Sequence, residues 1–102
     1  MSDYDIDKIS DIIHGRLRLG VMAYLANAEA ASFTELKNAL NVTQGNLSAQ
    51  MRKLEDAGFI SIDKRIEGRK PLTTVRITKQ GRKAFAAYLD ALSGVLGDAL
   101  KR

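Results

Sequence analysis

Apolar residues near the start of the chain recur every three to four positions, which is the spacing of one face of an α-helix. The first such set predicts an N-terminal helix over residues 1–13, and it consists of Ile6, Ile9, Ile12 and Ile13. The pair His14-Gly15 is expected to interrupt this helix. A second helix should follow and end near Asn27, with an apolar face made of Leu17, Val21, Tyr24 and Leu25.

A short third helix is marked by its capping residues. Ser32 and Glu35 have the Ser-x-x-Glu spacing of a capping box, in which each side chain accepts a backbone N–H of the first turn. Thr34 is an alternative cap. The apolar spacing carries this helix through Leu40, and a tight turn is expected at residues 41–42.

The fourth predicted helix begins at Thr43, whose hydroxyl can cap it, and ends near Ala57. Gly58 suits the left-handed conformation found after many helices, and Phe59 then falls where it can fold back onto the last turn. The stripe expected to be buried consists of Leu47, Met51 and Leu54.

After Gly58 the apolar period changes from that of a helix to that of a strand. Residues 59–66 place isoleucine at even spacing, and residues 72–77 are rich in β-branched side chains, so two strands are predicted. Residues 67–71 should form a charged hairpin loop. Thr78 can cap a final long helix, because apolar residues then recur to the end of the chain without a proline.

This order of elements predicts a mainly α fold of the α+β class. Two helices joined by a tight turn and followed by a two-stranded β-hairpin form a winged helix-turn-helix. We expect one domain over residues 1–102, which comprises an N-terminal helix at 1–13, a winged-helix core at 14–77 and a long C-terminal dimerisation helix at 78–102. A chain of 102 residues is typical of a single compact core.

The charge is distributed unevenly along the chain. The formal net charge is only +4, but residues 1–13 carry −3, because Lys8 is outnumbered by Asp3, Asp5, Asp7 and Asp11. Residues 59–83 carry +6, and their eight basic residues are Lys64, Arg65, Arg69, Lys70, Arg76, Lys79, Arg82 and Lys83. A local excess of this kind indicates a surface that binds an anionic partner.

Several kinds of chemistry are excluded by composition. The chain has no cysteine and one histidine, His14, so disulfides, thiol chemistry and a cysteine-based zinc site are ruled out. No credible Ser/His/Asp set or phosphate-binding loop is present, so we expect no enzyme activity, no metal and no cofactor. The N-terminus lacks the apolar core of a signal peptide, and no apolar run is long enough to span a membrane. We expect a cytoplasmic protein.

The helix after Thr43 is the candidate reading element. With its apolar stripe turned inward, small, amide and basic side chains face outward, as required for close approach to a DNA major groove. The predicted contact residues are Thr43, Gln44, Gly45, Asn46, Ser48, Ala49, Arg52 and Lys53. A solvated polar surface is the alternative interpretation of the same face.

The basic hairpin is the second candidate element. Arg65, Arg69 and Lys70 are expected to contact the DNA backbone or the minor groove. The alternative is that charge merely protects an edge strand from pairing with another chain. That alternative accounts for two or three basic residues more readily than for eight.

Six motifs together resemble the small MarR-like winged-helix transcriptional regulators. The match runs from about residue 12 to 92, which is most of the chain, and comes in the order of that family. The motifs are Arg16-Leu17-Arg18-Leu19, Phe33-Thr34-Glu35-Leu36, Asn46-Leu47-Ser48, Leu54-Glu55-Asp56-Ala57-Gly58-Phe59-Ile60, Glu67-Gly68-Arg69-Lys70-Pro71 and Ile77-Thr78-Lys79-Gln80-Gly81-Arg82-Lys83-Ala84-Phe85. The resemblance implies a dimeric, operator-binding bacterial or archaeal transcription factor. It assigns base reading to Gln44, Asn46, Ser48 and Arg52, and it places Arg69 and Lys70 at the wing. Little chain is left for a separate effector domain, so any small-molecule effector is unknown.

The last predicted helix supplies a candidate dimer interface. Its apolar residues alternate at spacings of four and three, as in a coiled-coil seam. They are Phe85, Leu89, Leu92, Leu96 and Ala99. The alternative is that this stripe packs against the chain's own first helix, and both can hold for different parts of the helix.

These observations predict a sequence-specific regulator that binds double-stranded DNA as a homodimer on a palindromic operator. One alternative is an architectural or RNA-binding module, which would use the same charge without reading bases. Another is a winged-helix scaffold whose basic surface binds an acidic protein. Function has to be decided at the site, because the fold alone hosts several.

Overall fold

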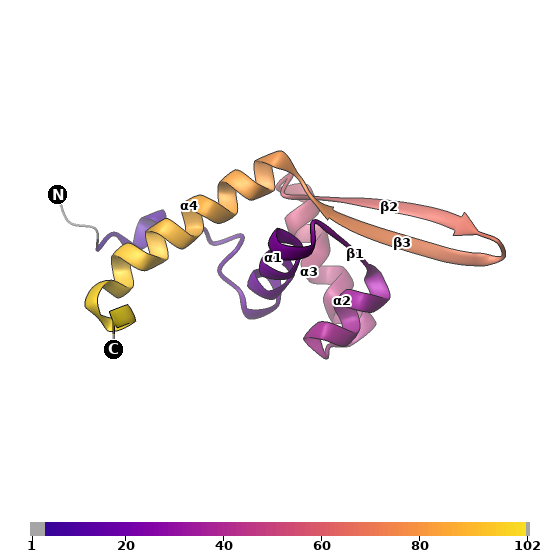
Figure 1. The fold of residues 1–102 in the computed structure, drawn as a ribbon, viewed down its shortest axis with the longest axis horizontal. Helices are drawn as coiled ribbons and strands as arrows, with labels where there is room; N and C mark the ends of the chain where they lie inside the picture. Colours follow the sequence, from indigo (N-terminus) through magenta and orange to yellow (C-terminus); the bar gives the residue numbers. More distant parts are fainter. Residues whose placement is uncertain (1–3, 102) are drawn as a thin grey trace.

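The computed structural model describes residues 4–101, so Asp3 of the predicted N-terminal helix and residue 102 of the predicted final helix lie outside the described residues. Helices and a small sheet alternate along the chain (Figure 1). In order, the elements are η1 (Ile6–Lys8), α1 (Arg16–Ala28), β1 (Ala30–Ser32), α2 (Phe33–Leu40), α3 (Gln44–Asp56), β2 (Ile60–Glu67), β3 (Lys70–Ile77), α4 (Lys79–Leu96) and η2 (Gly97–Lys101). The predicted winged helix-turn-helix is confirmed.

The molecule is elongated, with extents of 56 × 25 × 21 Å. Figure 1 shows β2 and β3 extending from one side of the body formed by α1, α2 and α3, while α4 extends from the other side. The short η1 packs along α4. The β2–β3 hairpin, called the wing below, therefore lies at the opposite end of the molecule from the outer half of α4.

One core joins the helical body to the base of the sheet. Its fully buried side chains come from α1, α2, α3, β3, α4 and the turn before α1, and the largest are Tyr88, Ile13, Met22, Leu25, Leu36, Leu47, Leu54, Val21 and Val75. Tyr24 of α1 also donates a hydrogen bond to the carboxylate of Glu35 on α2, which raises the pKa of Tyr24. The apolar stripes predicted for α1 and α3 thus meet in one place.

Local capping sets the helix boundaries. The hydroxyl of Ser32 accepts the N–H of Glu35 at 3.0 Å, so Ser32, and not Thr34, caps α2. Thr78 caps α4 by accepting the N–H of Gly81 at 2.9 Å. After α3, Gly58 has φ +82°, and the N–H of Phe59 donates to the Leu54 carbonyl at 3.0 Å, as expected for a Schellman motif.

The predicted helix over residues 1–13 is wrong. In the described part of this range, residues 4–13, only a three-residue 3₁₀ helix forms, with turns at residues 11–13. Ile13 is fully buried, but Ile6 is 63% exposed, so the isoleucines do not form one buried face. Isoleucine and aspartate are poor helix formers, and the hydroxyl of Ser10 satisfies the N–H of Ile13 outside a helix.

The sheet has three strands and not only the two of the predicted hairpin. The short β1 pairs antiparallel with β3, which gives the order β1-β3-β2. The sequence Ala30-Ala31-Ser32 carries no strand signal of its own. This segment becomes a strand because it pairs with the edge of β3 that β2 leaves free. The predicted five-residue loop is also too long. Glu67 and Lys70 are paired, and Gly68, at φ +64°, allows a two-residue turn.

The final α-helix is shorter than predicted. It ends at Leu96, because Gly97 adopts φ +51° and the following residues form η2. Ala99 therefore lies outside α4. Phe85 is only 8% exposed and belongs to the core of its own chain, so its assignment to a dimer interface does not hold in this structure. The heptad-like spacing combines a core-facing residue with outward-facing ones.

Candidate nucleic-acid interface

The α3 helix turns its apolar stripe into the core and its polar face outward. Leu47, Met51 and Leu54 are buried, as predicted. Outside this stripe, α3 exposes the predicted contact residues Gln44, Gly45, Asn46, Ala49, Arg52 and Lys53 together with the acidic Glu55 and Asp56, and Ser48 is half-buried at the flank. The structure therefore brings the predicted contact residues of this helix together on one accessible surface, next to Thr43 at its N-terminus.

The start of α3 is fixed by the turn that precedes it. Asn41 adopts the left-handed conformation at φ +53°, which ends α2 and redirects the chain. The hydroxyl of Thr43 then accepts the N–H of Asn46 at 3.2 Å and caps α3. In this arrangement Gln44 and Gly45, in the first turn of α3, are exposed.

A side-chain link connects α3 to the N-terminal segment. Arg18 of α1 donates to the Gln50 side-chain carbonyl at 2.5 Å, and its Nε donates to the Ile12 carbonyl at 2.6 Å. Gln50 in turn donates to the Oδ1 of Asn46 at 3.4 Å, a long hydrogen bond. Gln50 is thus a positioning residue beside the predicted reader Asn46, and the sequence analysis did not single it out.

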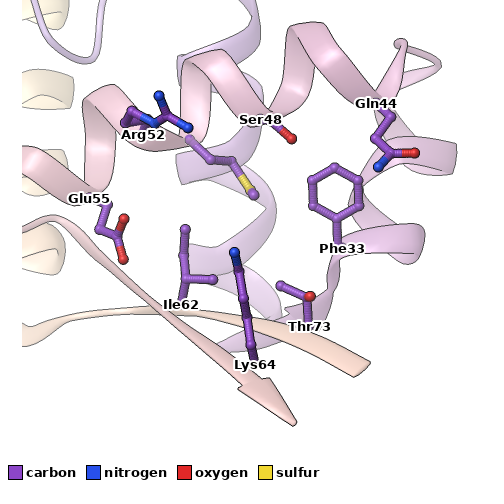
Figure 2. A pocket seen from close by; sticks show the side chains of 9 residues that line it. Phe33, Gln44, Ser48, Arg52, Glu55, Ile62, Lys64 and Thr73 are labelled. Atoms are coloured by element: carbon purple, nitrogen blue, oxygen red, sulfur yellow. The ribbon is translucent and has the colours of Figure 1, made fainter. Parts of the chain in front are cut away.

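A groove of about 320 Å³ separates α3 from the wing. Its floor is apolar, with Phe33, Met51 and Ile62, and its rim carries Gln44, Ser48, Arg52, Glu55, Lys64 and Thr73. Figure 2 shows Gln44 and Ser48 extending from α3 toward Phe33, while Lys64 extends from the sheet toward α3. The rim holds two cations and one carboxylate, so the groove carries a net positive charge.

The strand register decides which wing residues face this groove. Side chains alternate between the two faces of a strand, so Lys64 and Ile66 share the face of Ile62. Across the hairpin, Lys64 pairs with Thr73 and Ile66 pairs with Pro71. The groove face of the wing therefore continues outward through these four residues.

Arg65 lies on the face of the wing opposite the groove. Its Nε contacts the Oδ2 of Asp63 at 2.6 Å, which is the same-face neighbour two residues earlier. Lys70 pairs with Glu67 and shares that outer face, whereas Arg69 is exposed in the turn itself. Lys64, which the sequence analysis did not name as a contact residue, is the wing cation that lines the groove beside α3.

Besides Met51, which was predicted to be buried, five residues that line the groove were not predicted as contact residues. They are Phe33, Glu55, Ile62, Lys64 and Thr73. The basic segment at 59–83 already contained Lys64, and a correct register would have selected it. The other four come together only through packing of α2, α3 and the sheet, so no local pattern marks them.

The outer half of α4 exposes part of the predicted seam. Leu89 is 47% exposed and Leu96 is 40% exposed, whereas Leu92 packs partly against the core. Tyr88 is buried, which raises its pKa, and its hydroxyl lies 2.9 Å from the Nδ1 of His14. Near the same end of the molecule, Ile6 and Leu100 are also strongly exposed. The end of the molecule formed by η1, the outer half of α4 and η2 thus exposes several large apolar side chains.

Other kinds of site are not found in the described part of the chain. Residues 4–101 contain no group of three or more histidine, aspartate or glutamate side chains placed to hold a metal ion. Among the helices formed by these residues, none has both the length and the hydropathy to cross a membrane.

Comparison with known proteins assigns the family. Residues 17–96 match the winged helix DNA-binding domain family. The chain is 36% identical over 78 residues to an uncharacterized protein of Methanocaldococcus jannaschii, covering 76% of this chain and 85% of that protein.

Solved structures agree. A transcriptional regulator homologue from Pyrococcus horikoshii is 34% identical with a TM-score of 0.83, and the match covers 91% of each chain. A MarR-like transcriptional regulator from Thermotoga maritima shares the fold at 21% identity and a TM-score of 0.58, over 82% of this chain and 59% of that one. The chain therefore belongs to the winged helix DNA-binding domain family, and it shares its fold with a transcriptional regulator homologue and a MarR-like regulator, in agreement with the resemblance of the sequence motifs.

Proposed function

We propose that the protein is a sequence-specific transcriptional regulator that binds double-stranded DNA through α3 and the wing. The observation that carries the proposal is the groove between them, which has a reading face on one side and a basic strand on the other. A cytoplasmic location follows from this proposal, because the resemblance is to regulators of bacteria and archaea, whose chromosome lies there.

Base reading is assigned to the outer face of α3 in the major groove. Asn46 and Gln44 can pair with adenine edges, and Arg52 can pair with the two acceptors of guanine. Gly45 and Ala49 are exposed and small, so the helix backbone can approach the bases closely. The first turn meets the bases, which is the docking geometry of other recognition helices.

The groove between α3 and the wing fits one DNA backbone. When a helix occupies the major groove and a hairpin reaches the neighbouring minor groove, the sugar-phosphate strand between the two grooves passes between these elements. Lys64 supplies a cation there, and the hydroxyls of Ser48 and Thr73 supply neutral donors. These contacts position the protein on DNA without selecting a sequence.

We also propose a homodimer that pairs through the outer half of α4 and binds a palindromic operator. Support comes from Leu89 and Leu96, which lie on one face of α4 and leave 47% and 40% of their surface exposed. A two-fold axis at this end would place two α3 helices on successive major grooves. Gel filtration with light scattering should give a dimer for wild type and a monomer for Leu89→Asp. Ala87→Asp, exposed on the other side of α4, is the matched control and should stay dimeric.

Selection of bound duplexes from a random pool, followed by sequencing, tests specificity and symmetry together. The expected result is a motif with two inverted half-sites. Duplexes bound with equal affinity whatever their sequence would contradict base reading and favour an architectural or RNA-binding module. Absence of any salt-sensitive DNA binding would contradict the proposal altogether and favour a protein-interaction scaffold.

Substitutions in the two elements should have different effects. Asn46→Ala or Arg52→Ala should each cost about 1–3 kcal/mol on the preferred site and relax the preference at particular base pairs. Arg69→Ala should weaken binding to all DNA sequences alike and lower the salt dependence of binding by about one phosphate contact. Uniform weakening by Asn46→Ala and Arg52→Ala would show that α3 does not read bases.

A further inference from the structure

The tip of the wing carries an exposed apolar pair. Ile66 leaves 76% of its surface accessible, which is the largest value among the exposed large hydrophobic residues of the described chain. Pro71 is directly opposite it in the register and is also exposed. Single exposed hydrophobic residues are common. Here two are paired across strands at the end of a projecting hairpin, one step from the turn.

This pair lies on the functional face of the wing. Ile66 follows Ile62 and Lys64 at intervals of two residues, and both of these line the groove beside α3. Ile66 and Pro71 therefore extend the groove face outward, and both are exposed near the end of the β2–β3 hairpin, which projects away from the helical body (Figure 1). Both side chains are conformationally stiff, so little entropy is lost when they are held in a contact.

The spacing along the strand matches the spacing of DNA features. A strand advances about 3.3 Å per residue, so Ile66 lies about 7 Å farther out than Lys64. The minor groove is about 6 Å wide. If Lys64 contacts the backbone that passes through the groove, Ile66 comes to lie over the minor groove on the far side of that backbone.

Charge around the pair identifies the partner as nucleic acid. Lys64 precedes Ile66 on the same face, and Arg69 and Lys70 follow at the turn. Phosphates line both edges of the minor groove, so these cations can bind there while the apolar pair faces the sugars and base edges. A second copy of the chain fits poorly, because its own wing tip would bring the same cations together.

We propose that Ile66 and Pro71 form an apolar wedge that enters the minor groove next to the major groove contacted by α3. Apolar side chains in minor grooves partly unstack a base step and bend the duplex, which is least costly at flexible pyrimidine–purine steps. The wedge thus selects operators by deformability at positions that no polar side chain reads. This inference rests on the proposed DNA-binding function.

Ile66→Thr tests the wedge, because threonine keeps the β-branched shape and strand propensity but replaces the ethyl branch of isoleucine with a hydroxyl. The conservative control is Ile66→Val. Two duplexes are compared, both carrying the selected half-sites. One has TA steps under the wing tip, as located by footprinting, and the other has a stiff A-tract there. Binding is measured over a range of salt concentrations, and bending is measured by energy transfer between the duplex ends.

For Ile66→Thr we expect about tenfold weaker binding to the TA duplex, less than twofold change on the A-tract duplex, and a smaller bend. The salt slope should be unchanged, since no phosphate contact is lost. Ile66→Val should behave as wild type. Equal effects of Ile66→Thr on both duplexes, or no effect on either, would overturn the wedge. Loss of the dimer in Ile66→Thr would overturn it in favour of a contact with a second copy.

Failure of the wedge and failure of the proposed function give different results. If wild type selects no sequence and binds no duplex, the DNA-binding proposal fails and the wedge fails with it. If wild type selects an operator and Ile66→Thr binds and bends both duplexes as wild type does, only the wedge proposal is wrong. Circular dichroism and thermal melting should be unchanged by either substitution, because the side chain contributes little to the core.

Discussion

Gly81 is the position where a single methyl group should be least tolerated. It is buried in the first turn of α4, and a Cβ placed there would lie 2.0 Å from the carbonyl oxygen of Phe59 and 2.9 Å from its carbonyl carbon. That carbonyl belongs to the backbone and accepts the N–H of Thr78 at 3.1 Å. Neither the new Cβ nor the Phe59 carbonyl can rotate away, because both are fixed to the backbone. Gly81→Ala therefore requires α4 to move relative to the segment that follows α3.

The expected cost follows from the bonds that this movement breaks. Loss of the Thr78 cap costs about 1 kcal/mol. Loss of the Thr78–Phe59 hydrogen bond costs about another 1 kcal/mol. The residual overpacking costs about 1–3 kcal/mol. Alanine returns about 1 kcal/mol through its higher helix propensity. The free energy of unfolding should therefore fall by about 2–4 kcal/mol for Gly81→Ala.

Urea denaturation followed by circular dichroism measures this loss. With an m-value of about 2 kcal/mol/M, the midpoint should fall by about 1–2 M. Wild type and variant must be compared at equal protein concentration, because dimerisation would add to apparent stability. Gly45→Ala is the matched control. It lies in the first turn of α3, nothing would contact its Cβ within 4 Å, and it should keep or gain stability. A Gly81→Ala protein within about 0.5 kcal/mol of wild type would refute the reasoning, since that is the range of neutral surface substitutions.

Three further predictions concern capping, the wing and pH. Ser32→Ala should lower the free energy of unfolding by about 1 kcal/mol, because its hydroxyl caps α2, while Thr34→Ala should be nearly neutral; the reverse order in urea would contradict the observed cap. Lys64→Gln should lower the salt dependence of DNA binding by about one phosphate, whereas Arg65→Gln should not, and equal effects would contradict the assigned faces. Burial raises the pKa of Tyr88 above 10.0, so its contribution to stability is complete below pH 10 and is lost as pH rises through the raised value, because the unfolded state releases the proton first. Denaturation at pH 9 and pH 11 should show a smaller alkaline loss in Tyr88→Phe, and an equal loss would contradict this.

The features predicted correctly from the sequence depend on near neighbours. A cap such as Thr43 binds an N–H three residues later, and Gly58 needs only its own φ angle, so both act within a few residues. The stripe of α3 likewise follows from helical spacing along one element. These local signals were sufficient for the order of the main helices, the hairpin and the exposed face of α3.

The features predicted wrongly depend on distant partners. β1 forms because β3 offers a free edge more than forty residues later. The isoleucines before His14 have helical spacing, but only Ile13 is fully buried and Ile9 packs partly against the core, while Ser10 and Arg18 hydrogen-bond to the backbone of this segment. Spacing alone cannot show whether a partner surface exists, so it overestimated this helix.

By itself, the sequence determined the winged helix-turn-helix, the family, and the residues that α3 presents, because periodicity, caps and turn residues act locally. The tertiary structure decided which basic residue of the wing lies beside α3. Register turned Lys64 toward the groove and Arg65 away, and a shift of one residue reverses that choice. It also assigned Phe85 to the chain's own core and left Leu89 exposed, although both fit one heptad-like pattern. The spacing of apolar residues shows which side of a helix or strand a residue lies on, whereas only the tertiary structure shows whether that side contacts the core, another element or solvent.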